Sequence, residues 1–178
     1  MDFLALINKY YAENPPLEEI LLVNSRQVAD RCLEIAAKHP EMKLDTTFLE
    51  EAAMIHDIGI FMTDADKIFC FGEAPYLCHG YLGAQLMRKE GYERHARVCE
   101  RHTGTGLTKE IIIERNLPLP HQDFQPETLE EKLICYADKY YSKTHLKKEK
   151  SFEQVVNSLQ KHGEQVVATF KQWKELFE

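Results

Sequence analysis

Several features that mark membrane, secreted or nucleic-acid-coating proteins are scarce or missing in this sequence. No apolar stretch approaches the roughly 20 residues needed to cross a bilayer, and the first residues, MDFLALINKY, lack the basic start and apolar run of a secretion signal. Cysteines are few, odd in number and never spaced as C-x-x-C, which argues against a disulfide framework or a cysteine-rich zinc site. We therefore expect a cytoplasmic protein without membrane contact, whose reduced thiols lie mostly in the core: Cys32, Cys70, Cys78, Cys99 and Cys135.

Positive charge is also in deficit. The chain has 22 Lys and Arg against 29 Asp and Glu, a formal net charge of −7. A protein that binds nucleic-acid backbones or anionic membranes without specificity needs a basic stripe, so the composition gives no strong nucleic-acid signal. A small anionic ligand stays compatible, because a bound metal ion supplies local positive charge whatever the net charge is.

No segment alternates strongly between apolar and polar residues, and helical spacing prevails instead. We predict a short helix over about residues 3–11 that ends before Pro15-Pro16, and a longer helix from Leu17 to His39 that Pro40 ends. Residues 60–75 show no sustained period and predict a loop. Further helices are predicted over about residues 75–90, 93–102 and 108–115.

Three capping boxes mark the starts of further helices. The box at residues 47–50 opens a helix to about Asp57, with Gly59 as the C′ residue. The box at 128–131 opens a helix to about Tyr141, and the box at 151–154 opens a terminal helix over 151–177. With 178 residues and no repeat, the sequence predicts one compact all-α domain spanning residues 1–178.

His56 and Asp57 stand at the end of an apolar helix, in EEAAMIHDIG. One interpretation is that His56 caps the helix and Asp57 is a solvated turn residue. However, an aspartate at a helix C-terminus meets the unfavourable end of the macrodipole, and a cation would offset that cost. Spacing alone leaves both interpretations open.

Four motifs in order carry a family resemblance. MIHDIG resembles the HDIG signature of the HD phosphohydrolase superfamily, and CHGYLGA around His79 is similar to its H-G-x-x-G-A segment. RHTGTG around His102 resembles its H-T-x-G segment, and LICYADKY, which contains Asp138, is similar to its final A-D. The resemblance covers about residues 17–145. It implies a multi-helix HD-domain fold and a metal-dependent phosphohydrolase.

The resemblance also implies roles for these residues. His56, Asp57 and Asp138 would hold one divalent ion, and Asp57 would bridge to a second ion held by His79 and His102, which makes Asp57 the catalytic residue. Bound metal activates water and neutralises phosphoryl charge. Imidazole and carboxylate ligands without thiolate suit Mn, Fe, Mg, Co or Zn and do not choose among them, nor between one ion and two.

One departure concerns the early helix, where the family has a histidine in a segment like H-S-x-x-V-A. The matching segment here is NSRQVA, so Asn24 stands in the histidine's place. An amide oxygen can ligate a hard ion such as Mg²⁺. Asn24 is therefore either a weakened metal ligand or a polar helix residue without a metal role.

Basic residues near the motifs are candidates for binding substrate phosphate, or else are solvated charges. They are Arg26, Arg101, Lys109 and Lys139. The stretch KTHLKKEK at residues 143–150 is interpreted as a solvated loop, with phosphate contact as the alternative.

The leading hypothesis is hydrolysis of a phosphate ester or anhydride in a nucleotide-like small molecule through metal-activated water. The motifs look most like the symmetrical diadenosine-tetraphosphate hydrolase branch. A rival hypothesis, motivated by Asn24, is a weakened HD domain that binds metal or nucleotide as a regulatory module. A helical adaptor without metal is a third. The sequence predicts no oligomeric state.

Overall fold

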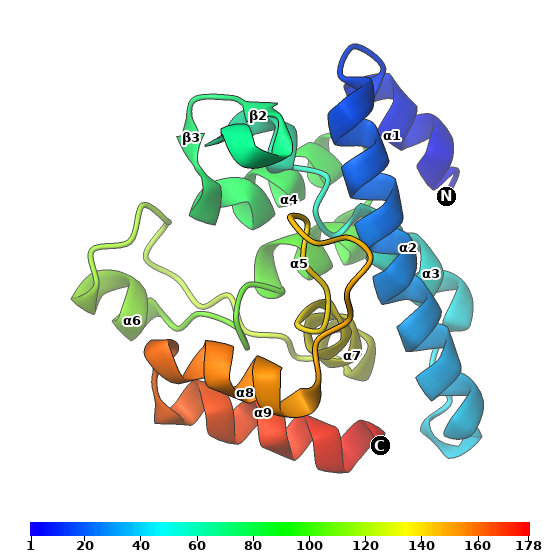
Figure 1. The fold of residues 1–178 in the computed structure, drawn as a ribbon, viewed down its shortest axis with the longest axis vertical. Helices are drawn as coiled ribbons and strands as arrows, with labels where there is room; N and C mark the ends of the chain where they lie inside the picture. Colours follow the sequence, from blue (N-terminus) through cyan, green and yellow to red (C-terminus); the bar gives the residue numbers. More distant parts are fainter.

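Helices surround the centre of the molecule, and the expected all-α class is confirmed (Figure 1). The computed structural model describes residues 1–178. None of its helices combines the length and apolar character needed to cross a membrane. The helices are α1 (Phe3–Tyr11), α2 (Pro15–Lys38), α3 (Thr46–Ile55), α4 (His79–Lys89), α5 (Glu93–Arg101), α6 (Lys109–Glu114), α7 (Leu129–Asp138), α8 (Phe152–Leu159) and α9 (Glu164–Phe177).

A small sheet occupies the segment for which we predicted a loop. Strand β1 (Thr63–Ala65) pairs antiparallel with β2 (Cys70–Phe71) and parallel with β3 (Ala74–Pro75). Single 3₁₀ turns at Ile60–Met62 and Tyr76–Cys78 flank these strands. The prediction of an unstructured loop was wrong because strands of two or three residues are too short to show an alternating pattern.

Side-chain caps fix where the helices begin. Asn14 accepts a hydrogen bond from the Leu17 N–H at 3.3 Å, so Pro15 opens α2, where a missing N–H costs nothing. The Asp45 carboxylate accepts from the Phe48 N–H at 3.0 Å and caps α3, so the capping box predicted at residues 47–50 was wrong. The boxes that begin at Thr128 and Ser151 are confirmed.

Glycines in the left-handed region end two helices. Gly91, at φ 87°, follows α4, as predicted. Gly163, at φ 118°, divides the terminal segment into α8 and α9, so the single helix predicted over 151–177 was wrong. The two helices lie side by side as a hairpin (Figure 1). Its Phe170 ring packs against Tyr136 of α7 at a centroid distance of 4.9 Å, which docks the hairpin on the rest of the core.

Two apolar cores divide the interior between them. One joins α2, α3, α7 and the α8–α9 hairpin, and the other joins α1, the start of α2, α4 and α5. All five cysteines are free and buried, as expected for reduced core thiols. The ends of α3, α4, α5 and α7 meet between the two cores, and this is where the candidate site lies.

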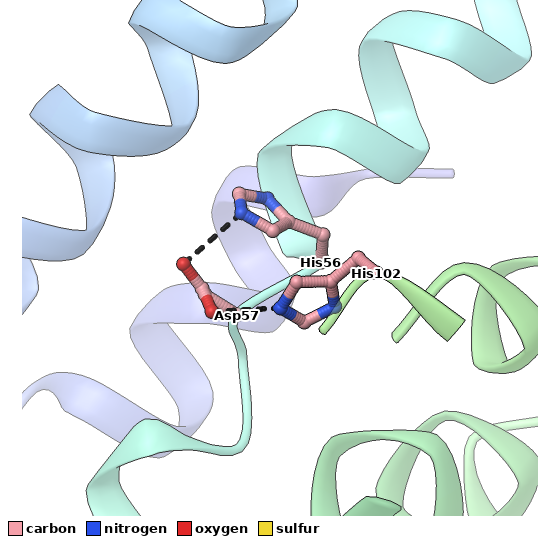
Figure 2. Close-up of side chains that lie close together, drawn as sticks. All are labelled: His56, Asp57 and His102. Atoms are coloured by element: carbon pink, nitrogen blue, oxygen red, sulfur yellow. Dashed lines mark ion pairs between the residues drawn. The ribbon is translucent and has the colours of Figure 1, made fainter. Parts of the chain in front are cut away.

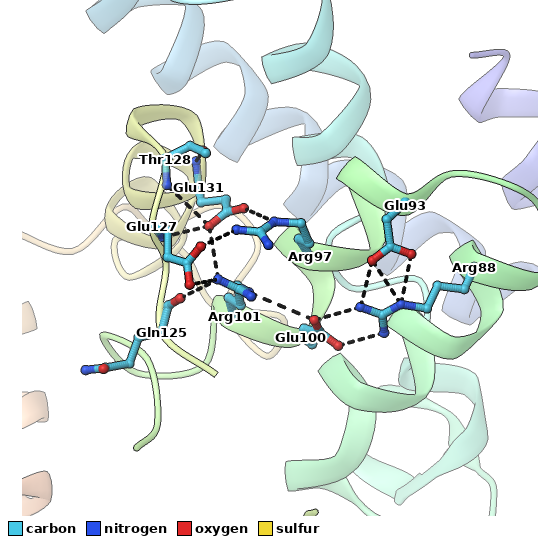
Figure 3. Close-up of polar contacts among 9 residues, drawn as sticks. All are labelled: Arg88, Glu93, Arg97, Glu100, Arg101, Gln125, Glu127, Thr128 and Glu131. Carbon is cyan, nitrogen blue, oxygen red and sulfur yellow. Dashed lines mark hydrogen bonds and ion pairs between the residues drawn. The ribbon is translucent and has the colours of Figure 1, made fainter. Parts of the chain in front are cut away.

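A network of arginines and glutamates braces three of these helices (Figure 3). Arg88 of α4 makes a two-pronged pair with buried Glu100 of α5, with both N–O distances at 2.8 Å. Arg97 of α5 donates to buried Glu131 of α7 at 2.8 Å. Because charge-assisted pairs with fixed forks hold geometry as well as charge, the network sets the positions of α4, α5 and α7 relative to one another.

Candidate metal centre

The candidate site is built from residues at the ends of four helices. His56 follows the last residue of α3, Asp57 comes next, and His79 is the first residue of α4. His102 caps the C-terminus of α5, and Asp138 is the last residue of α7. Helix α7 ends at Asp138, so the prediction that it continues to about Tyr141 was wrong.

The Asp57 carboxylate is the meeting point of three imidazoles. His56 Nε2 lies 3.0 Å from Asp57 Oδ2, whereas the Nε2 atoms of His79 and His102 lie 3.2 and 3.3 Å from Oδ1. Figure 2 shows His56 facing one carboxylate oxygen of Asp57 and His102 facing the other. The Nε2 atoms of His79 and His102 are 3.0 Å apart, and His56 Nε2 also lies 3.3 Å from Asp138 Oδ1. The five residues that the four motifs single out therefore converge.

Backbone carbonyls orient all three rings in the same way. The Nδ1 atoms of His56, His79 and His102 lie 2.7, 2.6 and 2.7 Å from the carbonyl oxygens of Ala53, Tyr76 and Cys99. A carbonyl only accepts, so Nδ1 carries the proton and donates it. In a neutral ring this leaves the Nε2 lone pair free and directed at Asp57. Metal-binding histidines are typically fixed by such outer contacts.

The residues present fit a divalent cation. Asp57 is fully buried, yet neither of its oxygens accepts a hydrogen bond of acceptable direction, although ring nitrogens lie close. Nitrogen and oxygen atoms that ligate one ion at about 2.0–2.2 Å are separated by about 3.0–3.5 Å. The atoms of His56, Asp57 and His102 lie close enough together to share an ion. A divalent ion at this point would be ligated by the lone pairs that the imidazoles and the Asp57 carboxylate direct at one another.

The charges of the cluster also indicate a site for a cation. Burial alone would raise the pKa of Asp57, but the charges of His56 and Lys143 hold it well below its usual range. Burial alone would lower the pKa of His56, but Asp57 and Asp138 raise it to about 10. For His102, burial dominates and lowers the pKa to about 4. The carboxylates are thus ionised and demand positive charge, which a proton on His56 supplies when no metal does.

Two lysines also meet these carboxylates. Lys139 Nζ lies 2.6 Å from Asp138 Oδ2, and Lys143 Nζ lies 2.5 Å from Asp57 Oδ2. The interpretation of residues 143–150 as solvated was therefore wrong for Lys143, whose side chain is only 14% exposed. Apart from the local excess of lysine, no sequence signal indicates this contact, because Lys143 is remote from the HDIG motif along the chain.

The glycines of the motifs let the helix ends approach closely. A Cβ atom on Gly59 would lie 2.2 Å from the His79 carbonyl oxygen and 2.5 Å from the Gly83 nitrogen. A Cβ atom on Gly80 would lie 2.4 Å from the Cys99 carbonyl oxygen. The prediction of Gly59 as the C′ residue was wrong, because α3 ends at Ile55 with His56 as its C-cap and the φ of Gly59 is −83°. Glycine is required at position 59 because a side chain there would collide with the backbone of α4. This close approach packs the HDIG loop against the start of α4, where His79 lies.

The remaining candidates differ in their contacts. Asn24 of α2 is 1% exposed, and neither polar atom of its amide has a hydrogen-bond partner, so its role as a ligand stays a prediction. The guanidinium of Arg26 binds Glu50, and that of Arg101 binds Glu127 and the Gln125 carbonyl. Lys109 is exposed on α6. The phosphate contacts expected of these three basic residues stay predictions, whereas Lys139 lies at the cluster.

Comparison with known proteins gives a family and few names. Residues 21–143 match the HD domain family. An uncharacterized protein of Methanocaldococcus jannaschii is 34% identical over 124 residues, which cover 64% of this chain and 66% of that protein.

Two proteins named tRNA (cytidine(56)-2'-O)-methyltransferase are also similar. The one from Picrophilus torridus is 34% identical over 99 residues, 55% of this chain and 25% of its own length. The one from Thermoplasma volcanium is 27% identical over 161 residues, 90% of this chain and 40% of its own length. The chain thus spans less than two thirds of each relative, and no solved structure matches it.

Proposed function

We propose that this chain, which belongs to the HD domain family, is a metal-dependent phosphohydrolase that cleaves a phosphate ester or anhydride in a nucleotide-like small molecule. The observation that carries the proposal is the convergence of three carbonyl-fixed imidazoles on the buried Asp57 carboxylate. A divalent ion would be ligated by the lone pairs that this arrangement directs at one point, in place of the proton on His56 and the Lys143 ammonium that otherwise balance Asp57. This arrangement is suited to holding a metal against a phosphate.

His56, Asp57 and Asp138 would hold one divalent ion, and Asp57, His79 and His102 would hold a second. A divalent ion bound there supplies Lewis acidity for a water molecule and for the phosphoryl group. Asp57 is the catalytic carboxylate of the proposal, because its two oxygens face different imidazoles and it can serve both ions. Tyr76 stacks on the His79 ring at a centroid distance of 4.7 Å and keeps that ring in place.

Lys139 and Lys143 are the proposed contacts to the reacting phosphate. In the chain without metal, the charges of Asp138 and Asp57 raise the pKa of Lys139 and Lys143 against the effect of burial, so both lysines are ammonium ions at neutral pH. With a divalent ion held by these carboxylates, phosphoryl oxygens would replace the carboxylates as partners of the two ammonium groups. They would attract and orient the substrate as fixed charges without exchanging protons.

The test combines metal analysis with turnover. Purified protein is analysed for metals and assayed with added Mn²⁺ on p-nitrophenyl phosphate, its bis ester and a panel of nucleotides. We expect bound divalent metal and hydrolysis of at least one substrate. Asp57→Asn should lose both, whereas Asp64→Asn, which changes an exposed aspartate of β1, should keep both. Circular dichroism of each variant checks folding. Unchanged metal content and turnover in Asp57→Asn would contradict the proposal.

A regulatory module that binds metal or nucleotide without turnover is the second candidate. Two observations favour it: an asparagine stands in place of the family's first histidine, and two lysine ammonium groups already neutralise the carboxylates. Tightly bound metal with no turnover on any substrate of the panel would select this candidate. A protein that binds neither metal nor nucleotide would exclude both candidates.

The name tRNA methyltransferase describes the two longer relatives as whole proteins. The shared segment covers a minority of their length, so we do not propose methyl transfer for this chain. The cytoplasmic location expected from the free thiols also stays a prediction.

A further inference from the structure

A cavity of about 600 Å³ opens beside the metal centre and is rich in lysine. Its volume lies within the range of roughly 300–1,000 Å³ that is usual for small-molecule sites. Asp138 and Tyr76 line it on the side of the metal centre. The wall carries four lysines, Lys67, Lys139, Lys143 and Lys150, against two aspartates, Asp66 and Asp138. In a chain with a net charge of −7, this is a local excess of positive charge that suits an anion.

The four lysines fall into two pairs. Lys139 and Lys143 bind the carboxylates of the metal centre. The ammonium groups of Lys67 and Lys150 make no hydrogen bond or ion pair with any residue of the chain. The imidazole of His162, in the 3₁₀ turn after α8, also makes none and lines the same cavity. The wall therefore offers unused donors beyond those at the metal centre.

Lys150 is the most informative member of this set, because it is half-buried and unpaired. Burial lowers its pKa, and the charges of Lys139 and Lys143 add to this effect against Asp138. Burial and the nearby charges of Lys161 and Arg115 likewise lower the pKa of His162. Withdrawing an ammonium group from water without a partner costs free energy. An anionic ligand that paired with the ammonium group would offset this free-energy cost.

Part of this wall lies beyond the residues that match the family. The match ends at residue 143, whereas Lys150, Ser158 and His162 come from the segment after it and from the α8–α9 hairpin region. The hairpin packs on α7 through the apolar core, and its region contributes Ser158 and His162 to the wall of this cavity. The wall is thus a feature of this chain's own C-terminal segment.

We propose that Lys67, Lys150 and His162 form a subsite for a second phosphate group, so that the preferred substrates carry linked phosphates, as nucleoside diphosphates and triphosphates do. The inference rests on the proposed function, in which Lys139 and Lys143 bind the reacting phosphate beside the metal centre. A cavity of this size that continues to further unpaired cations accommodates the next phosphate of the same small molecule.

The test compares Lys150→Met and Lys67→Met with Lys147→Met. Methionine keeps the apolar stem and removes the charge, and Lys147 is an exposed lysine of the same loop that does not line the cavity. We expect Lys150→Met and Lys67→Met to raise KM for ADP by about tenfold or more, the effect of about 1.4 kcal/mol of lost binding. Turnover of p-nitrophenyl phosphate, which has a single phosphate, and metal content should stay unchanged. Lys147→Met should behave like the unmodified chain.

Equal losses on both substrates, or no loss on either, would overturn the subsite while leaving the proposed function intact. If the unmodified chain hydrolyses nothing, the proposed function fails, and the subsite is tested by calorimetric titration with inorganic pyrophosphate. Binding that is weakened about tenfold or more by Lys150→Met but not by Lys147→Met would support the subsite. Absent binding, or equal binding by all forms, would overturn it.

Discussion

Replacement of Gly59 by alanine tests how the HDIG loop and α4 are held together. The added Cβ would lie 2.2 Å from the His79 carbonyl oxygen and 2.5 Å from the Gly83 nitrogen. Both are backbone atoms that no rotamer change can move, so α4 must shift by about 1 Å to reach an ordinary contact distance. The backbone of Gly59, at φ −83° and ψ −3°, accepts alanine without strain, so the cost is steric alone.

The magnitude follows from two opposing effects. A crowded substitution of this kind costs about 1–3 kcal/mol, and so close an approach to backbone places it at the upper end. Alanine at a compatible position gains about 0.4–1 kcal/mol through the unfolded chain. We expect a net loss of about 2 kcal/mol in the free energy of unfolding, measured by urea denaturation. Because His79 begins α4, its Nε2 should also move away from Asp57, and Mn²⁺ affinity should fall by about 10- to 100-fold.

Gly91→Ala is the control. Gly91 has a φ of 87° and no atoms within 4 Å of an added Cβ, so alanine there costs backbone strain of about 1–2 kcal/mol without moving the site. Its stability should fall by a similar amount while metal affinity stays unchanged. If Gly59→Ala keeps the stability and metal affinity of the unmodified chain, the argument about the close approach is refuted.

Three further predictions concern packing, pH and metal. Phe170→Ala removes a fully buried ring that docks α9 on α7 and should cost about 3–5 kcal/mol in urea denaturation; a loss below about 1 kcal/mol would contradict the packing. Burial lowers the pKa of His95 from its ordinary 6.5 against the raising effect of Glu51, so the unfolded chain takes up this proton first as pH falls. This contribution to stability is complete above pH 6.5 and is lost as pH falls toward the folded pKa. The free energy of unfolding, measured by denaturation at about pH 7.5 and 5.5, should therefore drop less for His95→Gln than for the unmodified chain. Finally, removal of metal with EDTA should lower Tm and Mn²⁺ should restore it, with a gain of about 2.7 kcal/mol at a free concentration of about 100 times Kd; an unchanged Tm would contradict a site formed only in the folded chain.

Local sequence signals predicted much of the fold. The capping boxes at Thr128 and Ser151 were right because a cap depends on residues only three apart. The break at Gly163 was missed because apolar spacing continues across it, and only the packing of the hairpin on α7 shows that the chain turns back. The start of α3 was misplaced because Asp45 and Thr47 are both good caps, and tertiary context decides between them.

The same distinction applies to the candidate site, where motifs identified some residues and others depend on contacts between distant parts of the chain. His56, Asp57, His79, His102 and Asp138 were found because four motifs mark them, and the structure brings all five together. Lys143 was missed because its contact with Asp57 depends on how the chain folds back after α7. The place of Lys150 in the cavity wall also depends on how the chain folds back after α7. The motif resemblance therefore indicated which side chains converge, whereas the lysines that face them could be identified only from the fold.

The most direct measurement of the central claim is the position of bound metal. A crystal of the protein soaked in Mn²⁺ and measured for anomalous scattering should show a peak where the Nε2 atoms of His56, His79 and His102 meet the Asp57 carboxylate. An absent peak at saturating Mn²⁺, or a peak only at surface carboxylates away from Asp57, would contradict the account.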